Sequence, residues 1–269
     1  MNTIAYEIDG QRTELEFPST LAEMNGEQLI AAVRNMLSGK DIPLADLAVL
    51  TGVPTDTLEL FSPFQLYSLR EMFTFLHDAN REALNFREWK IRAITVNGTT
   101  WYGPMSNFAN ITWEEFVYVD QCFLNGLHRP MVAALFRPER EGYNGETDRR
   151  VPFTTFGTAN RYELLGEPDP ALQTAILLNY VAMRRASLEE TYPQLFPQHG
   201  SEPDDTHEAD FTDEDPETAD APSGNFSWTG VHRNLLGDNI QDEEKYLHLN
   251  VHTVLNRLNQ LIIDNRKHH

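Results

Sequence analysis

The chain is poor in cysteine: Cys122 is the only one in 269 residues, so no disulfide can form within it. This excludes a small secreted domain held together by disulfides. Long apolar runs are also absent, because the longest, AILLNYV at 175–181, is far shorter than the roughly 20 residues that span a bilayer. The N-terminal stretch MNTIAYEIDGQRTELEF carries charges throughout and has no apolar core of the kind found in secretory signals. We therefore expect a cytoplasmic protein with no membrane partner.

Basic residues are scarce as well. The chain has 21 Lys and Arg against 41 Asp and Glu, which gives a formal net charge of −20. Binding to a phosphate backbone needs clustered basic side chains, so we expect no nucleic-acid partner. The acidic charge is concentrated between 202 and 220, where ten acidic residues occur without a Lys or Arg. A segment with so little to bury predicts disorder.

That segment divides the chain. We predict a mainly helical domain over 1–198, a disordered acidic linker over 199–224 and a C-terminal helical segment over 225–269.

Motifs that mark common enzymes are missing from the sequence. It contains no Walker A loop, no dinucleotide-binding glycine fingerprint, no Gly-x-Ser-x-Gly elbow and no CxxC pair. We therefore expect a protein that is not an enzyme and that uses no cofactor.

Two turn dipeptides predict β-hairpins. Asp9-Gly10 separates alternating apolar and polar residues within 3–17, and Asn97-Gly98 separates 90–96 from 99–102. Both dipeptides tolerate the positive φ angles of a tight two-residue turn. The remaining apolar patterns recur at helical spacing, so the fold class we predict is mainly α with two small β-hairpins, an α+β protein.

Three Ser/Thr-x-x-Glu/Gln patterns predict capped helix starts. They lie at Thr20 with Glu23, at 62–65, and at Thr112 with Glu115. Predicted helices cover about 26–37, 44–50, 63–76, 113–124, 129–136 and 171–189, with a polar loop over 138–152. In the first of them we expect one buried stripe, formed by Leu29, Ile30, Val33 and Leu37.

Isolated reactive residues have ordinary structural explanations. His248 and His252 lie four positions apart, but Leu249 stands where a zincin has its glutamate, and no third ligand is evident. We favour two surface or boundary histidines and expect no metal. Cys122 lies among Phe116, Val119 and Phe123, where a thiol is more often buried than nucleophilic. Glu115 is explained as a capping residue, and Glu114 as a solvated charge near the helix start.

Basic charge gathers around the polar loop, which is the most unusual local feature. The arginines are Arg129, Arg137, Arg140, Arg149 and Arg150. They could form a binding surface for acidic partners, in which Arg137 and Arg140 would be the contact residues. The alternative, which we favour, is internal pairing with Glu139, Glu141 and Asp148.

The order of these pieces resembles a family of uncharacterised prophage proteins from Bacteroidota genomes, encoded among tail genes. The segments that carry the resemblance are FPSTLAEMNGEQL, LFSPFQLYSL, YGPMSNFANITWEEFVYVDQCF, MVAALFRPEREGYNGETDRR, the AILLNY helix, and the pattern from FSWTGVHRNLLGD to VLNRLNQL. Together they cover nearly the whole chain except the acidic segment. The closing pattern is similar to that of tail-assembly chaperones.

The resemblance implies a role in phage tail assembly inside the bacterial host. The first hypothesis is a chaperone that binds the tape measure protein or another tail protein, such as the tube. A second is a virion structural subunit, a connector or baseplate component. A third, suggested by charge alone, is an acidic DNA mimic that inhibits DNA-binding proteins. The sequence leaves open whether the chain forms a homo-oligomer.

The C-terminal helix carries the partner surface that we predict. Its apolar stripe has i, i+3, i+4, i+7 spacing and consists of Val251, Val254, Leu255, Leu258, Leu261 and Ile262. If the linker tethers this helix loosely, the stripe could offer a docking face to another protein. The alternative is that the helix folds back on the core.

Overall fold

The computed structural model describes residues 1–76, 84, 86–145, 148–196, 228, 231 and 243–267. Within them the chain is mainly helical with two small antiparallel sheets, so the predicted α+β class is confirmed. The acidic linker expected at 199–224 lies outside the described residues. No described helix has the length and apolar character needed to cross a membrane.

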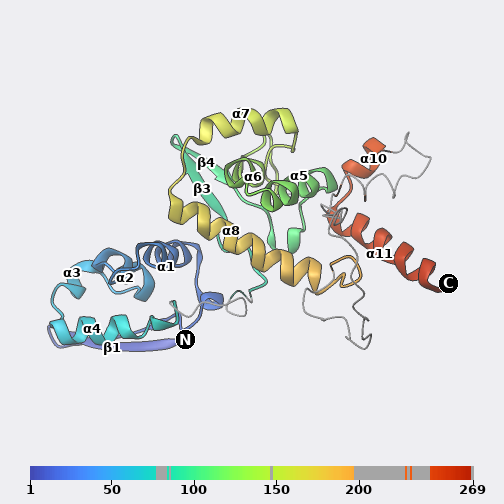
Figure 1. Ribbon diagram of the computed structural model, residues 1–269. Coiled ribbons are helices and arrows are strands. Elements are labelled where there is room, and N and C mark those ends of the chain that lie inside the picture. The colour runs from blue at the N-terminus through green and yellow to red at the C-terminus, as the bar shows by residue number, and fades with distance from the viewer. Residues whose placement is uncertain are drawn as a thin grey trace, which may run out of the picture.

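The N-terminal part is a hairpin covered by short helices (Figure 1). Its elements are β1 (Asn2–Ile8), β2 (Gln11–Phe17), the 3₁₀ turn η1 (Leu21–Glu23), α1 (Gly26–Ser38), α2 (Leu44–Thr51), α3 (Thr55–Leu58), α4 (Pro63–Glu71) and η2 (Thr74–Leu76). The hairpin turns at Asp9 and Gly10, whose φ angles of 49° and 75° are those that the Asp-Gly pair predicts.

The central part combines the second sheet with four helices. Its elements are β3 (Ala93–Val96), β4 (Thr99–Tyr102), η4 (Ser106–Phe108), α5 (Trp113–Leu124), α6 (His128–Leu135), β5 (Arg137–Pro138), α7 (Thr155–Leu165), α8 (Pro170–Arg184) and the π-helical turn η5 (Arg185–Glu189). The hairpin predicted at Asn97-Gly98 is confirmed. A third strand, β5, pairs with β4 and is too short to have given a sequence signal.

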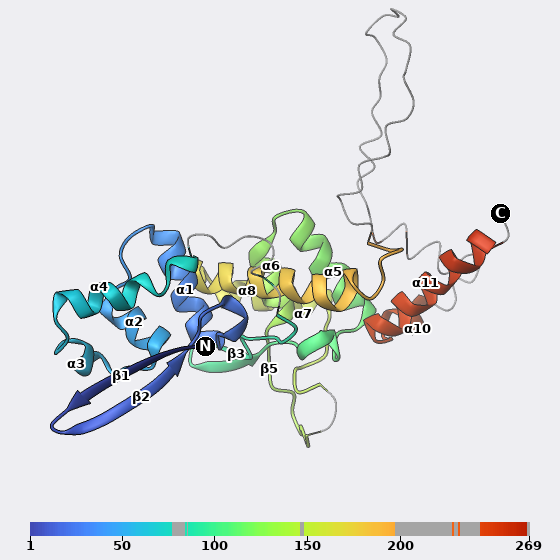
Figure 2. The same ribbon diagram turned by 90° about the horizontal axis from the view of Figure 1, so that it is seen from below.

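Helix α8 joins the parts of the molecule. It packs on α1 of the N-terminal part and on α6 of the central part (Figures 1 and 2). Its buried face includes Ile176, Tyr180 and Met183, as the apolar pattern of the sequence predicts.

Of the three predicted capping boxes, one forms and two do not. Ser62 and Gln65 form the predicted box at the start of α4. Thr20 makes no side-chain cap, because Glu23 instead accepts hydrogen bonds from the N-terminal ammonium and Ser19. The ammonium, which donates the strongest of these bonds, lowers the pKa of Glu23 to about 2. Thr112 caps α5, but Glu115 does not close a box there and is buried.

Two further helical predictions need correction. On the stripe expected in α1, Leu29 and Val33 are buried as predicted and Ile30 is half-buried, but Leu37 is exposed. Ala31 and Ala32 complete the buried apolar face. Helix α7 was not predicted. Its only buried residues are Thr158 and Arg161, so it has no apolar stripe from which a helix could be recognised.

The C-terminal segment packs into the same core as the rest of the chain. Its described helices are α10 (Glu243–Leu247) and α11 (Val251–Lys267), and both contact α5. Trp228 is buried with its ring edge-on against Trp113 and Phe116.

Buried Asp120 on α5 connects this segment to α8. Its carboxylate accepts hydrogen bonds from Trp228 Nε1 at 2.6 Å, Tyr180 Oη at 2.7 Å and Arg184 Nε at 2.8 Å. One carboxylate therefore holds three segments of the chain together.

Candidate partner-binding cleft

A buried ionic network underlies the polar loop between β5 and α7. Glu115, in the first turn of α5, accepts hydrogen bonds from Arg137 Nη2 at 2.9 Å on one oxygen and from Arg150 Nη1 at 2.9 Å on the other. All three side chains are buried. A buried charge must be paired to be stable, so this network fixes both ends of the loop to α5.

Asp148 and Arg150 complete the network. Arg150 Nε and Nη2 donate to the Asp148 carboxylate at 3.0 and 2.9 Å, and Nη1 also donates to the Leu135 carbonyl at 2.8 Å. Burial lowers the pKa of Arg150, but attraction to Glu115 and Asp148 outweighs it and raises that pKa overall. For Arg137 the effect of burial is larger than that of the neighbouring carboxylates, so its pKa is lowered. Within the described residues, Nε and Nη1 of Arg137 have no hydrogen-bond partner.

The outer side of the loop presents aromatic and guanidinium groups. Arg149 lies flat against Tyr102, with its guanidinium carbon 3.8 Å from the ring centroid, and pairs with Glu139 at 2.8 Å. Tyr143 lies near the same guanidinium at 5.6 Å. Cation–π contacts of this kind attract a guanidinium group to an aromatic ring.

His248 and Asn250, which lie between α10 and α11, form the facing wall. Asn250 Nδ2 donates to the Ala109 carbonyl at 2.8 Å, and the backbone N–H of Val251 donates to the Ile111 carbonyl at 3.0 Å. These bonds attach the C-terminal segment to the residues just before α5. His252, next in the chain, bonds to the Asn107 carbonyl and to Tyr192 Oη, so its ring has a structural role.

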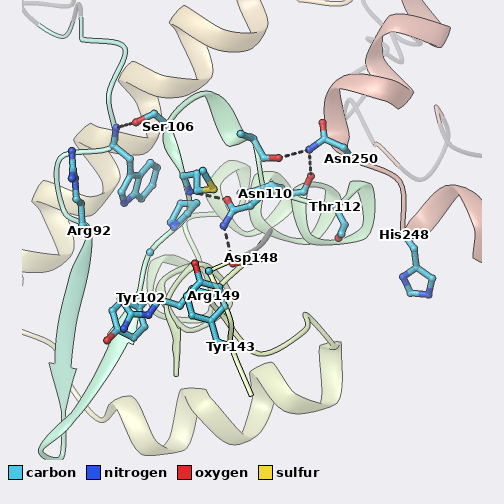
Figure 3. Close-up of a pocket in the computed structure, with 17 residues that line it drawn as sticks. Arg92, Tyr102, Ser106, Asn110, Thr112, Tyr143, Asp148, Arg149, His248 and Asn250 are labelled. Carbon is cyan, nitrogen blue, oxygen red and sulfur yellow. Dashed lines mark hydrogen bonds between the residues drawn. The ribbon is translucent and has the colours of Figure 1, made fainter. Parts of the chain in front are cut away.

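Between the loop and the C-terminal segment lies a cleft of about 990 Å³, which Figure 3 shows in close-up. It is open on one side and mixes aromatic, amide and guanidinium groups. Its lining comprises Trp89, Arg92, Tyr102, Gly103, Pro104, Met105, Ser106, Ala109, Asn110, Ile111, Thr112, Tyr143, Gly145, Asp148, Arg149, His248 and Asn250.

The residues predicted to contact a partner differ in how deeply they are buried. Val251, Val254, Leu255 and Leu258 are buried in the core, so the first half of the stripe follows the alternative in which the helix folds back. Leu261 and Ile262 are half-buried. Arg137 is buried in the network and does not face solvent, as the internal-pairing alternative predicts, while Arg140 is half-buried beside Tyr143.

The cleft itself was not predicted from sequence. The structure brings together the polar loop and His248, which the sequence singled out separately, and adds Asn250 and the segment 102–112 that connects β4 to α5. Glycines beside tyrosines, in Tyr102-Gly103 and in the Gly142–Gly145 stretch, are the only local signal for it. Among the described residues, no cluster of three His, Cys, Asp or Glu side chains could hold a metal ion.

Comparison with known proteins gives no family: no protein-family model, curated protein or solved structure matches the chain.

Proposed function

We propose that this chain is a non-enzymatic phage tail-assembly protein, a chaperone that binds the tape measure protein or another tail protein in the cleft. The proposal rests on where the segments that carry the resemblance lie in the fold. The segments 102–123 and 131–150 and the pattern over 226–261 all carry the resemblance to prophage tail-region proteins, and residues from all three line the cleft.

The chemistry of the cleft suits a polypeptide. Tyr102, Tyr143 and Met105 offer apolar and aromatic surface. The charged groups of its inner wall are already engaged, Asp148 by Arg150 and Arg149 by Glu139. Aromatic and arginine side chains around such a hollow are typical of protein interfaces.

The test is co-expression with the tape measure and tube proteins of the same phage, followed by affinity capture of the tagged chain. Met105→Glu places a charge in the cleft at a side chain that is 52% exposed. Leu127→Glu is the matched control, because Leu127 is 51% exposed, precedes a helix as Met105 does, and lies outside the cleft.

We expect the wild type and Leu127→Glu to keep the tail protein soluble and to bind it, and Met105→Glu to lose at least about tenfold in affinity. Purified particles should lack the chain. Its presence in particles would instead identify a structural subunit such as a connector or baseplate component. If neither tail protein is captured by the wild type, the proposal is wrong.

A further inference from the structure

A second surface, away from the cleft, gathers exposed apolar side chains at the N-terminal part. The chain between α3 and η2 exposes Leu60, Phe64, Tyr67 and Met72 to solvent. Phe64 is 77% exposed. Large apolar side chains that cluster on the surface of an otherwise acidic protein are characteristic of interaction sites.

These side chains border a groove of about 580 Å³ between α4 and β1. The α4 wall contributes Phe64, Gln65, Ser68, Leu69 and Met72, and Leu60 and Phe61 close one end. The other wall is the six consecutive residues 3–8 of β1. Figure 2 shows the hairpin extending below α4, with β1 on the side nearer to the helix. A groove lined by consecutive residues of a strand, from both of its faces, runs along the edge of that strand.

This edge of β1 has unused backbone hydrogen-bonding groups. Among the residues that the structure describes, β1 pairs with β2 alone, and the pair Ile8–Gln11 closes the two-residue turn. The hydrogen-bonded pairs of an antiparallel ladder alternate from that point, so Thr3, Ala5 and Glu7 direct their N–H and C=O groups away from β2. Within the described part of the chain, no backbone or side-chain group bonds to these N–H groups.

The charge around the groove indicates the charge of the partner that it would attract. Residues 1–76 hold 11 Asp and Glu against four Lys and Arg. Glu7 lies in the groove lining, and no Lys or Arg does. A second copy of this chain would bring like charges together along the edge, whereas a basic segment would be attracted to it.

We propose that this groove, hereafter the β1 groove, binds an extended segment of another protein that adds to β1 as a third strand. The segment alternates apolar residues, which face α4, with Lys or Arg, which face the acidic surface. The backbone of the segment bonds to Thr3, Ala5 and Glu7, and its apolar side chains cover Phe64 and Met72. Strand addition to a free sheet edge is an established mode of peptide recognition. The β1 groove shares no residue with the cleft, so its occupancy does not rest on the function proposed above.

Synthetic peptides of about eight residues, a length within the ordinary range of strands, provide the probe. One alternates valine and lysine, a second alternates valine and glutamate, and a third is the valine–lysine peptide N-methylated on one backbone edge. We expect the valine–lysine peptide to bind the full chain at least about tenfold tighter than either of the others. Hydrogen exchange of the Thr3, Ala5 and Glu7 amides should slow on binding. The amides of Ile4, Tyr6 and Ile8 already bond to β2 and should change little.

Two variants locate the binding. Phe64→Ser removes the apolar wall, and Phe156→Ser is its matched control, because Phe156 is 79% exposed and is likewise the second residue of a helix, α7. Ala5→Pro removes one outward N–H without removing a bond to β2, and Ala5→Thr keeps that N–H. We expect Phe64→Ser and Ala5→Pro each to lose about tenfold or more in affinity, and both controls to bind like the wild type.

Several outcomes would overturn the proposal. They are equal binding of the N-methylated peptide, unchanged exchange at the three outward amides, equal losses in Phe64→Ser and Phe156→Ser, or dimerisation of the chain through β1 in place of peptide binding. Loss of peptide binding with tail-protein binding intact, or the reverse, separates this site from the cleft.

Discussion

Glu115 and Arg150 stand 35 positions apart in the chain and form a buried ion pair, with Nη1 of Arg150 2.9 Å from Oε1 of Glu115. Arg137 occupies the second oxygen of the same carboxylate. One glutamate therefore bonds to two buried guanidinium groups at the base of the loop that walls the cleft, and Asp148 supplies the second carboxylate.

Glu115→Gln should destabilise the fold strongly. The amide carries no charge, so Arg137 and Arg150 would share the single carboxylate of Asp148. A buried charge that loses its partner costs about 3–5 kcal/mol. Urea denaturation followed by circular dichroism measures the change in the free energy of unfolding. Glu114→Gln is the control: Glu114 lies one residue earlier in the same helical turn and should cost at most about 1 kcal/mol. Equal effects of the two variants would show that the network contributes nothing.

Trp228→Phe should also lower the free energy of unfolding. The substitution keeps an aromatic ring against Trp113 but removes the N–H that donates to buried Asp120. An acceptor left with one bond fewer in the core costs about 1–3 kcal/mol. Thermal unfolding measures the effect. A variant as stable as the wild type would mean that this bond does not hold the C-terminal segment.

Deleting 226–269 discriminates between the two arrangements considered for the C-terminal helix. Because Trp228, Val251 and Leu255 are core residues, we expect residues 1–225 alone to lose the cooperative thermal transition and to expose Trp113 to solvent. Tryptophan fluorescence and calorimetry report both. If the truncated chain unfolds at the same temperature as the intact protein, the result would instead support a loosely tethered C-terminal helix.

Alkaline pH should unfold the protein through Tyr180. Burial, and then the charge of Asp120, raise the pKa of Tyr180 well above its usual 10. The folded state therefore favours the protonated phenol: its stabilising effect is complete below pH 10 and is lost as pH rises beyond the pKa of the unfolded tyrosine. Tyr180→Phe should be less stable at pH 8 and lose less stability between pH 8 and 11. A loss as steep as that of the wild type would contradict this assignment.

Cys122 should resist thiol reagents in the folded protein. Burial raises the pKa of its thiol, so little thiolate forms at pH 8. A disulfide exchange reagent should react with Cys122 at once in urea, where the chain is unfolded, but slowly in the folded protein. Leu127→Cys adds an exposed thiol five positions after Cys122, and the new thiol should react quickly in the folded protein while Cys122 does not. Fast reaction of two thiols in the folded variant would contradict the burial of Cys122.

The sequence predicts local structure where a residue has one available role. Asp9-Gly10 and Asn97-Gly98 each specify their hairpin because few dipeptides adopt two positive φ angles. Ser62 with Gln65 specifies the start of α4 for a similar reason.

Prediction from sequence fails where the role of a residue depends on a side chain far away in the chain. Thr112-x-x-Glu115 has the same pattern as a capping box, yet Glu115 turns inward because Arg137 and Arg150 lie across from it, 22 and 35 positions later. Likewise, α7 packs through Thr158 and Arg161 and shows no apolar periodicity. The cleft is a property of three segments that meet only in the fold, so no window of sequence contains it.

The anchoring of Arg150 has a consequence for binding. Its donors reach Asp148, Glu115 and the Leu135 carbonyl, and bonds between 138–140 and 149–151 close the base of the loop. The conformational entropy of this part of the loop is therefore lost when the chain folds, not when a partner arrives. A partner that enters the cleft meets a wall whose base is already ordered, so less of its contact energy is spent on ordering and more remains as affinity.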